Sequence, residues 1–313
     1  MVSNGLRLPV IDPGPWRRLF SFKPNFLDLG SGALMHYIDH GQGPPVVMVH
    51  GNPTWSFMWR ALIKDLLGFR RLAPDHVGMG LSSRPLAKSY GFSLEDRIKD
   101  LDSFIHSLNL SEPIRLIVHD WGGPIGLGWA ARNADKVHSL IIMNSGLRKP
   151  PNYQMPFKLK LFKSCNFLGR ILAVELNLFV EGLIRVGSLR PIKEDAVRGF
   201  LAPYAQSQHR EAIGRFLADI PLKSSHRSHE PLKRLEIEFS NLNDKPLLLI
   251  WGLGDFVFSR AFLDDFLTLR PEAPALELEQ AGHYLLEDEP ELITEVIKAF
   301  FLNPSDFSLR PFS

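Results

Sequence analysis

The chain has 313 residues, of which 45% are hydrophobic and 22% charged, and its formal net charge is +2. This composition is typical of a globular protein and excludes a disordered or fibrous chain. The nearly balanced charge gives no reason to expect nucleic acid as a partner. The single cysteine, Cys165, can form neither an internal disulfide nor a zinc site, and its apolar surroundings predict a buried, unreactive thiol.

Targeting and membrane segments are not evident in the sequence. Residues 1–16 contain no apolar run of the kind that signal peptides carry. No stretch reaches the roughly 18 uninterrupted apolar residues of a transmembrane helix. The sequence therefore predicts a cytoplasmic protein, and its length favours one core with a large insertion over two independent domains.

Short apolar runs followed by small or polar residues recur along the chain. Five of them cover residues 45–49, 115–119, 139–143, 247–251 and 275–279. Runs of this kind, separated by helical patterns, are typical of parallel strands that helices bury on both faces. We therefore predict an α/β fold with a mostly parallel sheet flanked by helices.

The pattern changes after the third of these runs, where helical patterns and prolines replace strand-like ones. We predict a helical cap domain over residues 147–235, inserted into a core domain of residues 1–146 and 236–313. Within it, residues 148–234 hold 16 Lys and Arg against 7 Asp and Glu, a difference of +9. Such a basic surface predicts contact with a partner subunit, another protein or an anionic membrane surface, with a solvated helical face as the alternative.

Asp120 stands directly between the apolar run 115–119 and a helical pattern over residues 124–132. A sharp turn between strand and helix lifts a nucleophile above the carboxyl edge of a sheet. Serine is the usual nucleophile at such a turn, whereas a carboxylate displaces a leaving group from carbon and forms an ester. The sequence therefore predicts Asp120 as the nucleophile. A helix N-cap aspartate is the alternative, which the following Trp-Gly-Gly disfavours.

The loop His50-Gly51-Asn52-Pro53 follows the first apolar run. In folds with such a turn, this loop supplies one backbone N–H to the oxyanion hole and the residue after the nucleophile supplies the other. We therefore expect the amides of Asn52 and Trp121 to form the hole. His50 precedes this loop, which favours a structural hydrogen-bonding role over that of a base.

A histidine and a second carboxylate complete the predicted constellation. His283 follows the last apolar run and precedes residues 288–291, which have the pattern of a capped helix start. Asp255 follows the run 247–251, whereas the loop after run 139–143 contains no carboxylate. The chain order nucleophile, acid, base therefore predicts Asp255 as the acid that orients the base His283.

Together these residues resemble the haloalkane dehalogenase family, and the likeness extends over essentially the whole chain. The matching segments are residues 50–60, 73–85, 118–123, 251–258 and 281–288. The resemblance implies an α/β-hydrolase fold with a mostly parallel eight-stranded sheet and an inserted helical cap. It also implies that haloalkane and water give alcohol and halide through a covalent alkyl-enzyme ester, with a small apolar substrate and neither cofactor nor metal.

In that family two N–H donors hold the departing halide. One is the indole of the Trp after the nucleophile, which here is Trp121. The other is either a Trp in the cap or the Asn of the His-Gly-Asn-Pro loop. Because residues 147–235 contain no Trp, the resemblance assigns the second donor to Asn52. Asn52 combined with an acid at Asp255 resembles the third subfamily.

Other segments, at residues 201–204, 215–222 and 232–237, are similar to the β-lactone decarboxylases of bacterial long-chain olefin biosynthesis. That resemblance implies the same three catalytic residues acting on a strained lactone, with release of carbon dioxide. Epoxide hydrolases are a third alternative, although the contexts of Tyr153 and Tyr204 do not match the tyrosines that hold the epoxide oxygen. A non-catalytic hydrolase-like protein would have lost at least one of three catalytic positions, and here all three are filled.

Overall fold

A computed structural model describes residues 8–9, 11, 14–30, 32–86, 89–150, 153–154, 156, 171–221 and 223–309. Cys165 lies outside these residues. Among them, no helix is both long enough and apolar enough to span a lipid bilayer.

Eight strands form one sheet in the order β1-β2-β4-β3-β5-β6-β7-β8. They are β1 (Pro24–Asp28), β2 (Leu34–His40), β3 (Pro45–Val49), β4 (Arg70–Pro74), β5 (Ile114–Asp120), β6 (Val137–Ser145), β7 (Leu247–Gly252) and β8 (Ala275–Leu278). β2 runs antiparallel to both of its neighbours, and the other pairings are parallel. The predicted eight-stranded, mostly parallel sheet is confirmed.

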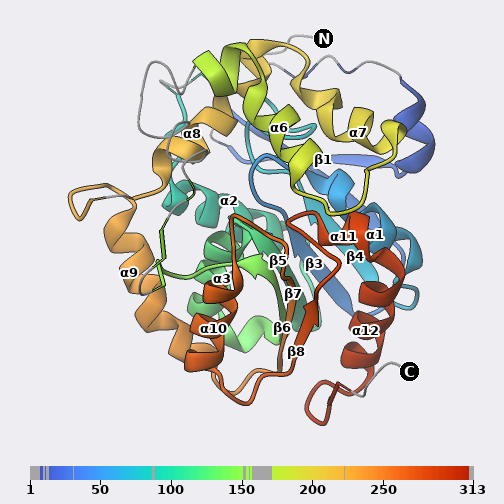
Figure 1. Cartoon of the computed structure of the whole chain (residues 1–313), viewed down its shortest axis with the longest axis vertical. Helices are drawn as coiled ribbons and strands as arrows, with labels where there is room; N and C mark the ends of the chain where they lie inside the picture. Colours follow the sequence, from blue (N-terminus) through green and yellow to red (C-terminus); the bar gives the residue numbers. More distant parts are fainter. Residues whose placement is uncertain are drawn as a thin grey trace.

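Helices cover both faces of this sheet. Those of the core are α1 (Arg60–Asp65), α2 (Leu94–Ser107), α3 (Gly122–Arg132), α10 (Arg260–Leu269), α11 (Leu285–Asp288) and α12 (Pro290–Leu302), with short 3-10 helices η1 (Pro15–Leu19), η2 (Ser56–Trp59), η3 (Ala134–Lys136) and η7 (Phe239–Leu242). Figure 1 shows α3 and α10 on one side of the sheet and α1 and α12 on the other. Because the central strands are buried on both faces, their residues must be apolar throughout. This is why they are visible in the sequence as continuous apolar runs.

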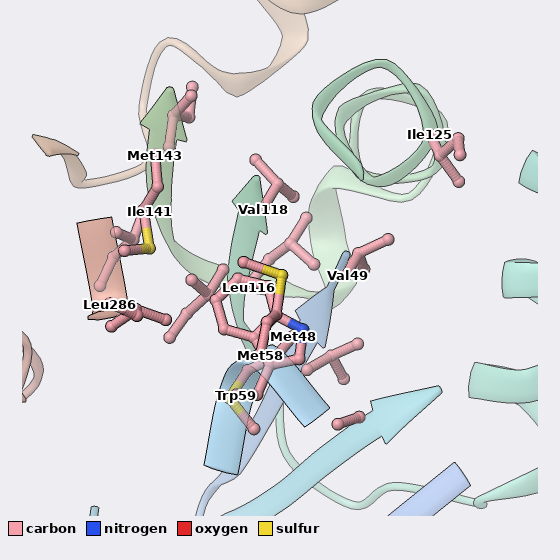
Figure 2. Packing of buried hydrophobic residues seen from close by; sticks show 14 of the residues in the cluster. Met48, Val49, Met58, Trp59, Leu116, Val118, Ile125, Ile141, Met143 and Leu286 are labelled. Atoms are coloured by element: carbon pink, nitrogen blue, oxygen red, sulfur yellow. The ribbon is translucent and has the colours of Figure 1, made fainter. Parts of the chain in front are cut away.

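The close packing of α3 on the sheet depends on Gly126, which has no side chain. A Cβ on Gly126 would lie 2.6 Å from Cγ1 of Val118 and 3.6 Å from Cγ2 of Val49. Figure 2 shows these two valines in the core, together with Ile125 of the same helix. This contact fixes the helix that begins just after Asp120.

In the part that the structure describes, the segment between β6 and β7 consists of helices joined by loops and turns, without a strand. Its elements are the π-helix η4 (Ile171–Glu175), α6 (Leu178–Val186), α7 (Glu194–Leu201), η5 (Ala202–Tyr204), η6 (Ser207–Arg210), α8 (Glu211–Asp219) and α9 (His229–Glu238). Figure 1 shows α6, α7 and α8 beyond one end of the strands, while α9 runs alongside the core. The predicted domain boundary at residue 235 falls within α9, and the division into core and cap stays a prediction.

Candidate active site

The backbone at Asp120 makes a sharp turn. Asp120 is the last residue of β5 and has φ of +52°, a left-handed value that is unusual for a residue other than glycine. A Cβ on Gly122 would lie 2.1 Å from the carbonyl oxygen of Val49, and one on Gly123 would lie 1.8 Å from Oγ of Ser145. The two glycines therefore let α3 begin immediately, which leaves the Asp120 side chain at the carboxyl edge of the sheet.

The predicted oxyanion amides both contact the Asp120 carboxylate. The backbone N–H of Asn52 donates to Oδ1 of Asp120 at 2.6 Å, and the N–H of Trp121 also donates to this carboxylate. The approach is so close that a Cβ on Gly51 would lie 2.0 Å from Oδ1. These donors therefore fix the carboxylate from one side.

His283 and Asp255 lie together on the other side of Asp120. Nδ1 of His283 lies 2.8 Å from Oδ2 of Asp255, and its Nε2 lies 3.9 Å from Oδ2 of Asp120. The side chain of Asp120 is held by its Oδ1, so Oδ2 faces the imidazole. Exposed fractions of 4% for Asp120, 3% for Asp255 and 1% for His283 place all three out of bulk water. The structure thus brings the three predicted residues together.

Asn144 is a site residue that sequence reasoning missed. It is the penultimate residue of β6, with φ of +33°, and donates from Nδ2 to Oδ2 of Asp255 at 2.9 Å, while its Oδ1 accepts from the N–H of Gly252 at 2.8 Å. The neighbouring Ser145 donates from Oγ to the carbonyl oxygen of Asp120 at 2.7 Å. Both residues directly follow the apolar run 139–143. Their place near Asp120 and Asp255 could have been predicted from this position, because the carboxyl ends of neighbouring parallel strands meet at one edge of the sheet.

The ionisation of these groups follows from burial and mutual contact. Burial raises the pKa of Asp120 to about 6, although His283 and the N–H groups of Trp121 and Asn52 oppose the rise. Burial acts to lower the pKa of His283, but the carboxylates of Asp255 and Asp120 outweigh it and leave that pKa raised. Burial acts to raise the pKa of Asp255, but His283 lowers it below its usual range. Asp255 is therefore a stable anion beside the imidazole.

The side chains predicted to hold a leaving anion both face the inserted helix α8. Nδ2 of Asn52 lies 3.4 Å from the carbonyl oxygen of Ile213, a long and weak hydrogen bond, and Oδ1 has no partner among the described residues. The Trp121 ring meets that of Phe216 edge-on, with centroids 6.4 Å apart. The Asn52 amide is therefore only loosely engaged and can donate to a bound group.

His50 has the structural role that the sequence predicts. Its Nδ1 lies 2.8 Å from the carbonyl oxygen of Gly51, and its Nε2 accepts from the N–H of His76 at 3.1 Å. Burial is the main cause of its lowered pKa. Both ring nitrogens are occupied by backbone groups, so His50 has none left to act as a base.

The helix start predicted over residues 288–291 is confirmed, with a proline in the first turn, but the predicted side-chain capping is wrong. α12 begins at Pro290 without a side-chain cap. Asp288 instead accepts from the N–H groups of Gly282 at 2.8 Å, Arg190 at 2.8 Å and Leu189 at 3.2 Å. Its carboxylate therefore links the loop that carries His283 to the inserted segment.

Comparison with known proteins agrees with this geometry. Residues 44–164 match a family model described as the alpha/beta hydrolase fold. A cis-3-alkyl-4-alkyloxetan-2-one decarboxylase of Shewanella oneidensis is 37% identical over 300 residues, which cover 92% of this chain and 94% of the relative. The chain belongs to the α/β-hydrolase family.

Within that family the relatives include both groups that the sequence resembles. Haloalkane dehalogenase 2 of Mycobacterium tuberculosis is 32% identical over 290 residues, covering 92% of this chain and 98% of the relative. The crystal structure of a haloalkane dehalogenase from Agrobacterium tumefaciens matches with a TM-score of 0.80 at 26% identity, covering 91% of this chain and 98% of that one. The α/β-hydrolase fold and the resemblance to haloalkane dehalogenases and β-lactone decarboxylases are confirmed.

Proposed function

We propose that this α/β-hydrolase family enzyme uses Asp120 to displace a leaving group from a saturated carbon, and that its substrate is a cis-dialkyl β-lactone. The observation that carries the chemistry is the state of the Asp120 carboxylate. The backbone N–H of Asn52 holds its Oδ1, while Oδ2 lies 3.9 Å from Nε2 of His283, a ring nitrogen that has no hydrogen-bond partner among the described residues. Oδ2 is therefore the atom that attacks.

The reaction takes two steps that balance without water. Oδ2 of Asp120 attacks the ring carbon that bears the ring oxygen, the ring C–O bond breaks, and its electron pair leaves on a carboxylate. In the second step the C–C bond to that carboxylate breaks and its electrons form the C=C bond. The ester C–O bond breaks in the same step and its electron pair returns the carboxylate of Asp120, so that the products are carbon dioxide and an alkene.

The choice of a lactone is supported by the relatives. Two cis-3-alkyl-4-alkyloxetan-2-one decarboxylases are 37% and 36% identical to this chain, against 32% for haloalkane dehalogenase 2. An oxetan-2-one is a β-lactone, and loss of carbon dioxide from it gives an alkene.

A side-by-side product assay tests the proposal. Purified enzyme is incubated with a cis-3,4-dialkyl β-lactone, a 1-bromoalkane and an alkyl epoxide, and carbon dioxide, alkene, halide and diol are measured. We expect carbon dioxide and alkene in equal amounts from the lactone. Diol from the epoxide or halide from the bromoalkane, with no product from the lactone, would replace lactone decarboxylation by the corresponding activity.

Haloalkane dehalogenation is the second candidate, and the side chains of Asn52 and Trp121 favour it. A leaving halide develops negative charge among apolar groups, where fixed N–H dipoles stabilise it without supplying a competing nucleophile. In this reaction Asp120 forms the alkyl ester, and water activated by His283 attacks its carbonyl carbon. The backbone N–H groups of Asn52 and Trp121 then serve as the oxyanion hole.

Asn52→Ala is expected to lower halide release about 10²-fold if the side-chain amide holds the halide. The substitution keeps the backbone N–H that contacts Asp120, so the loss reports on the side chain alone. Bromide should also change the fluorescence of Trp121, and the Trp121→Phe variant identifies that signal. Unchanged turnover together with emission that does not respond to bromide would remove the dehalogenase candidate.

Turnover is expected to fall at acidic pH because Asp120 must be ionised to attack. With a pKa raised to about 6, mainly by burial, Asp120 is increasingly protonated as the pH drops below that value. Below it kcat/KM should decline about tenfold per pH unit, because this ratio reports ionisation of the free enzyme. The profile is measured from pH 5 to 8 alongside thermal unfolding at each pH. A rate that stays constant down to pH 5 would contradict the raised pKa of Asp120.

The cellular location and the partners of the enzyme are part of the same proposal. A cytoplasmic location, a homo-oligomer and a contact of the basic inserted segment with a protein or an anionic membrane stay predictions. Several basic residues of that segment pair within the chain, among them Arg148 with Asp265 and Arg190 with Glu289. These pairs support the alternative of a solvated helical face, because they reduce the charge that is free to attract a partner.

A further inference from the structure

Tyr284 carries a buried hydroxyl group without a hydrogen-bond partner. The side chain is 2% exposed, and its hydroxyl makes no hydrogen bond with any described residue. A buried hydroxyl that has lost its water and found no replacement destabilises the folded protein. Such a group in a native structure therefore requires an explanation, and a ligand that completes the hydrogen bond is one.

The other buried tyrosines differ in this respect. The hydroxyl of Tyr204 accepts from the N–H of Gly80 at 3.3 Å and lies 3.4 Å from the carbonyl oxygen of Thr54, to which it donates. The hydroxyl of Tyr90 donates to the carboxylate of Asp100. Burial of a tyrosine in this fold therefore does not by itself leave the hydroxyl unpaired.

The position of Tyr284 is fixed from two sides. Its ring lies edge-on to that of His283, with centroids 5.6 Å apart, and edge-on to that of Phe200 in α7, with centroids 5.2 Å apart. Its backbone N–H donates to the carbonyl oxygen of Gly187 at 3.0 Å. A Cβ on Gly187 would lie 2.7 Å from the ring of Tyr284. The side chain therefore cannot turn away to find another partner.

Tyr284 directly follows His283, whose Nε2 lies 3.9 Å from Oδ2 of Asp120. Burial is the main reason that the pKa of Tyr284 is raised well above the ordinary value, and Asp120 is the charge that contributes most to the rise. Nε2 of His283, which lies 3.9 Å from the Asp120 carboxylate, and Oδ1 of Asn52, whose backbone N–H binds that carboxylate, are likewise buried without a partner among the described residues. Unpaired polar atoms therefore gather around Asp120, where a substrate would provide their partners.

We propose that the Tyr284 hydroxyl is a substrate-binding donor that hydrogen-bonds the exocyclic carbonyl oxygen of the β-lactone. This inference rests on the proposed function and adds the residue that recognises the oxygen of the substrate. As the ring opens, negative charge develops on the departing carboxylate, and the hydroxyl stabilises it. A haloalkane has no oxygen to accept this bond, so Tyr284 favours a lactone over a haloalkane of the same chain length.

Tyr284→Phe tests the inference because it removes one oxygen atom and keeps the ring packing. We expect kcat for the cis-dialkyl β-lactone to fall about 10²-fold with a smaller change in KM, as for loss of a donor that acts on developing charge. Halide release from a 1-bromoalkane should stay within about twofold of the wild-type value, because nothing in that substrate meets the hydroxyl. The melting temperature should be equal to or above that of the wild type, because an unpaired buried hydroxyl has been removed.

Tyr90→Phe is the matched control, since it removes a buried hydroxyl that has a partner, Asp100. It should lower the melting temperature and leave the ratio of lactone to bromoalkane activity unchanged. The inference is overturned if Tyr284→Phe decarboxylates the lactone at the wild-type rate, or if it loses both activities equally. A wild-type enzyme that releases no carbon dioxide from the lactone would instead overturn the proposed function, and the inference with it.

Discussion

His283→Phe is expected to react once with a 1-bromoalkane and then stall. Formation of the ester needs only the carboxylate of Asp120, whereas its hydrolysis needs a base to activate water. Steady-state halide release should therefore fall by about 10³-fold or more, at the upper end of what a general base contributes. Mass spectrometry should show the parent mass plus one alkyl group, on the peptide that contains Asp120, with one equivalent of halide released per chain.

Two comparisons sharpen this experiment. Asp255→Asn keeps the imidazole but removes the anion that orients it, so it should slow hydrolysis of the ester more than its formation. With the β-lactone, the loss in His283→Phe should be smaller, because decarboxylation regenerates Asp120 without water. An unmodified His283→Phe protein after incubation with a 1-bromoalkane that the wild type turns over, or an adduct on another residue, would mean that the nucleophile is assigned wrongly.

Asp120→Asn is expected to abolish both carbon dioxide release from the lactone and halide release from the bromoalkane. The amide oxygen can still accept from the N–H of Asn52, so the fold and the sharp turn at residue 120 are retained. The uncharged amide is, however, a poor nucleophile. The loss should be on the order of 10⁴-fold or more, as for removal of a covalent nucleophile.

The measurement combines product assays with intact mass and thermal unfolding. Asp120→Asn should unfold near the wild-type temperature and form no adduct, and Asp120→Ala should behave in the same way. Turnover in Asp120→Ala above about a thousandth of the wild-type rate, in a protein shown to be free of wild-type contamination, would exclude covalent catalysis by this residue.

The sequence predicts the central part of the fold and the three central site residues for one physical reason. Strands buried on both faces must be apolar throughout, so β3, β5, β6 and β7 stand out as continuous runs. Asp120 and Asp255 follow two of these runs directly, and His283 follows that of β8. Because the carboxyl ends of parallel strands meet at one edge, position in the chain is enough to bring them together.

The strands that were missed lack this signal. β1 alternates between exposed and half-buried residues, as an edge strand does, and β4 begins with two arginines. The helical patterns within residues 147–235 also hide a break, since Asn177 has φ of +56° and α6 begins only after it. Asparagine tolerates this conformation, so the apolar pattern continues while the helix does not.

Long-range polar contacts are the second kind of feature that the sequence does not reveal. Asp75 accepts locally from the N–H of Leu81 at 2.8 Å. It also accepts from the N–H of Ser56 at 2.6 Å and pairs with Nδ1 of His36 at 2.8 Å. Such partners are set by the register of neighbouring elements, which local patterns do not specify.

The carboxylate of Asp288 has a mechanical consequence. It accepts from the N–H groups of Leu189 and Arg190 in the α6–α7 connection and from that of Gly282, next to His283. The N–H of Tyr284 donates to the carbonyl oxygen of Gly187 in the same connection. If this connection moved away from the sheet, these hydrogen bonds would break together. The loop that positions His283 would then be displaced as well. The contact between the α6–α7 connection and the loop that carries His283 is therefore rigid. We expect long alkyl chains to reach Asp120 from another side.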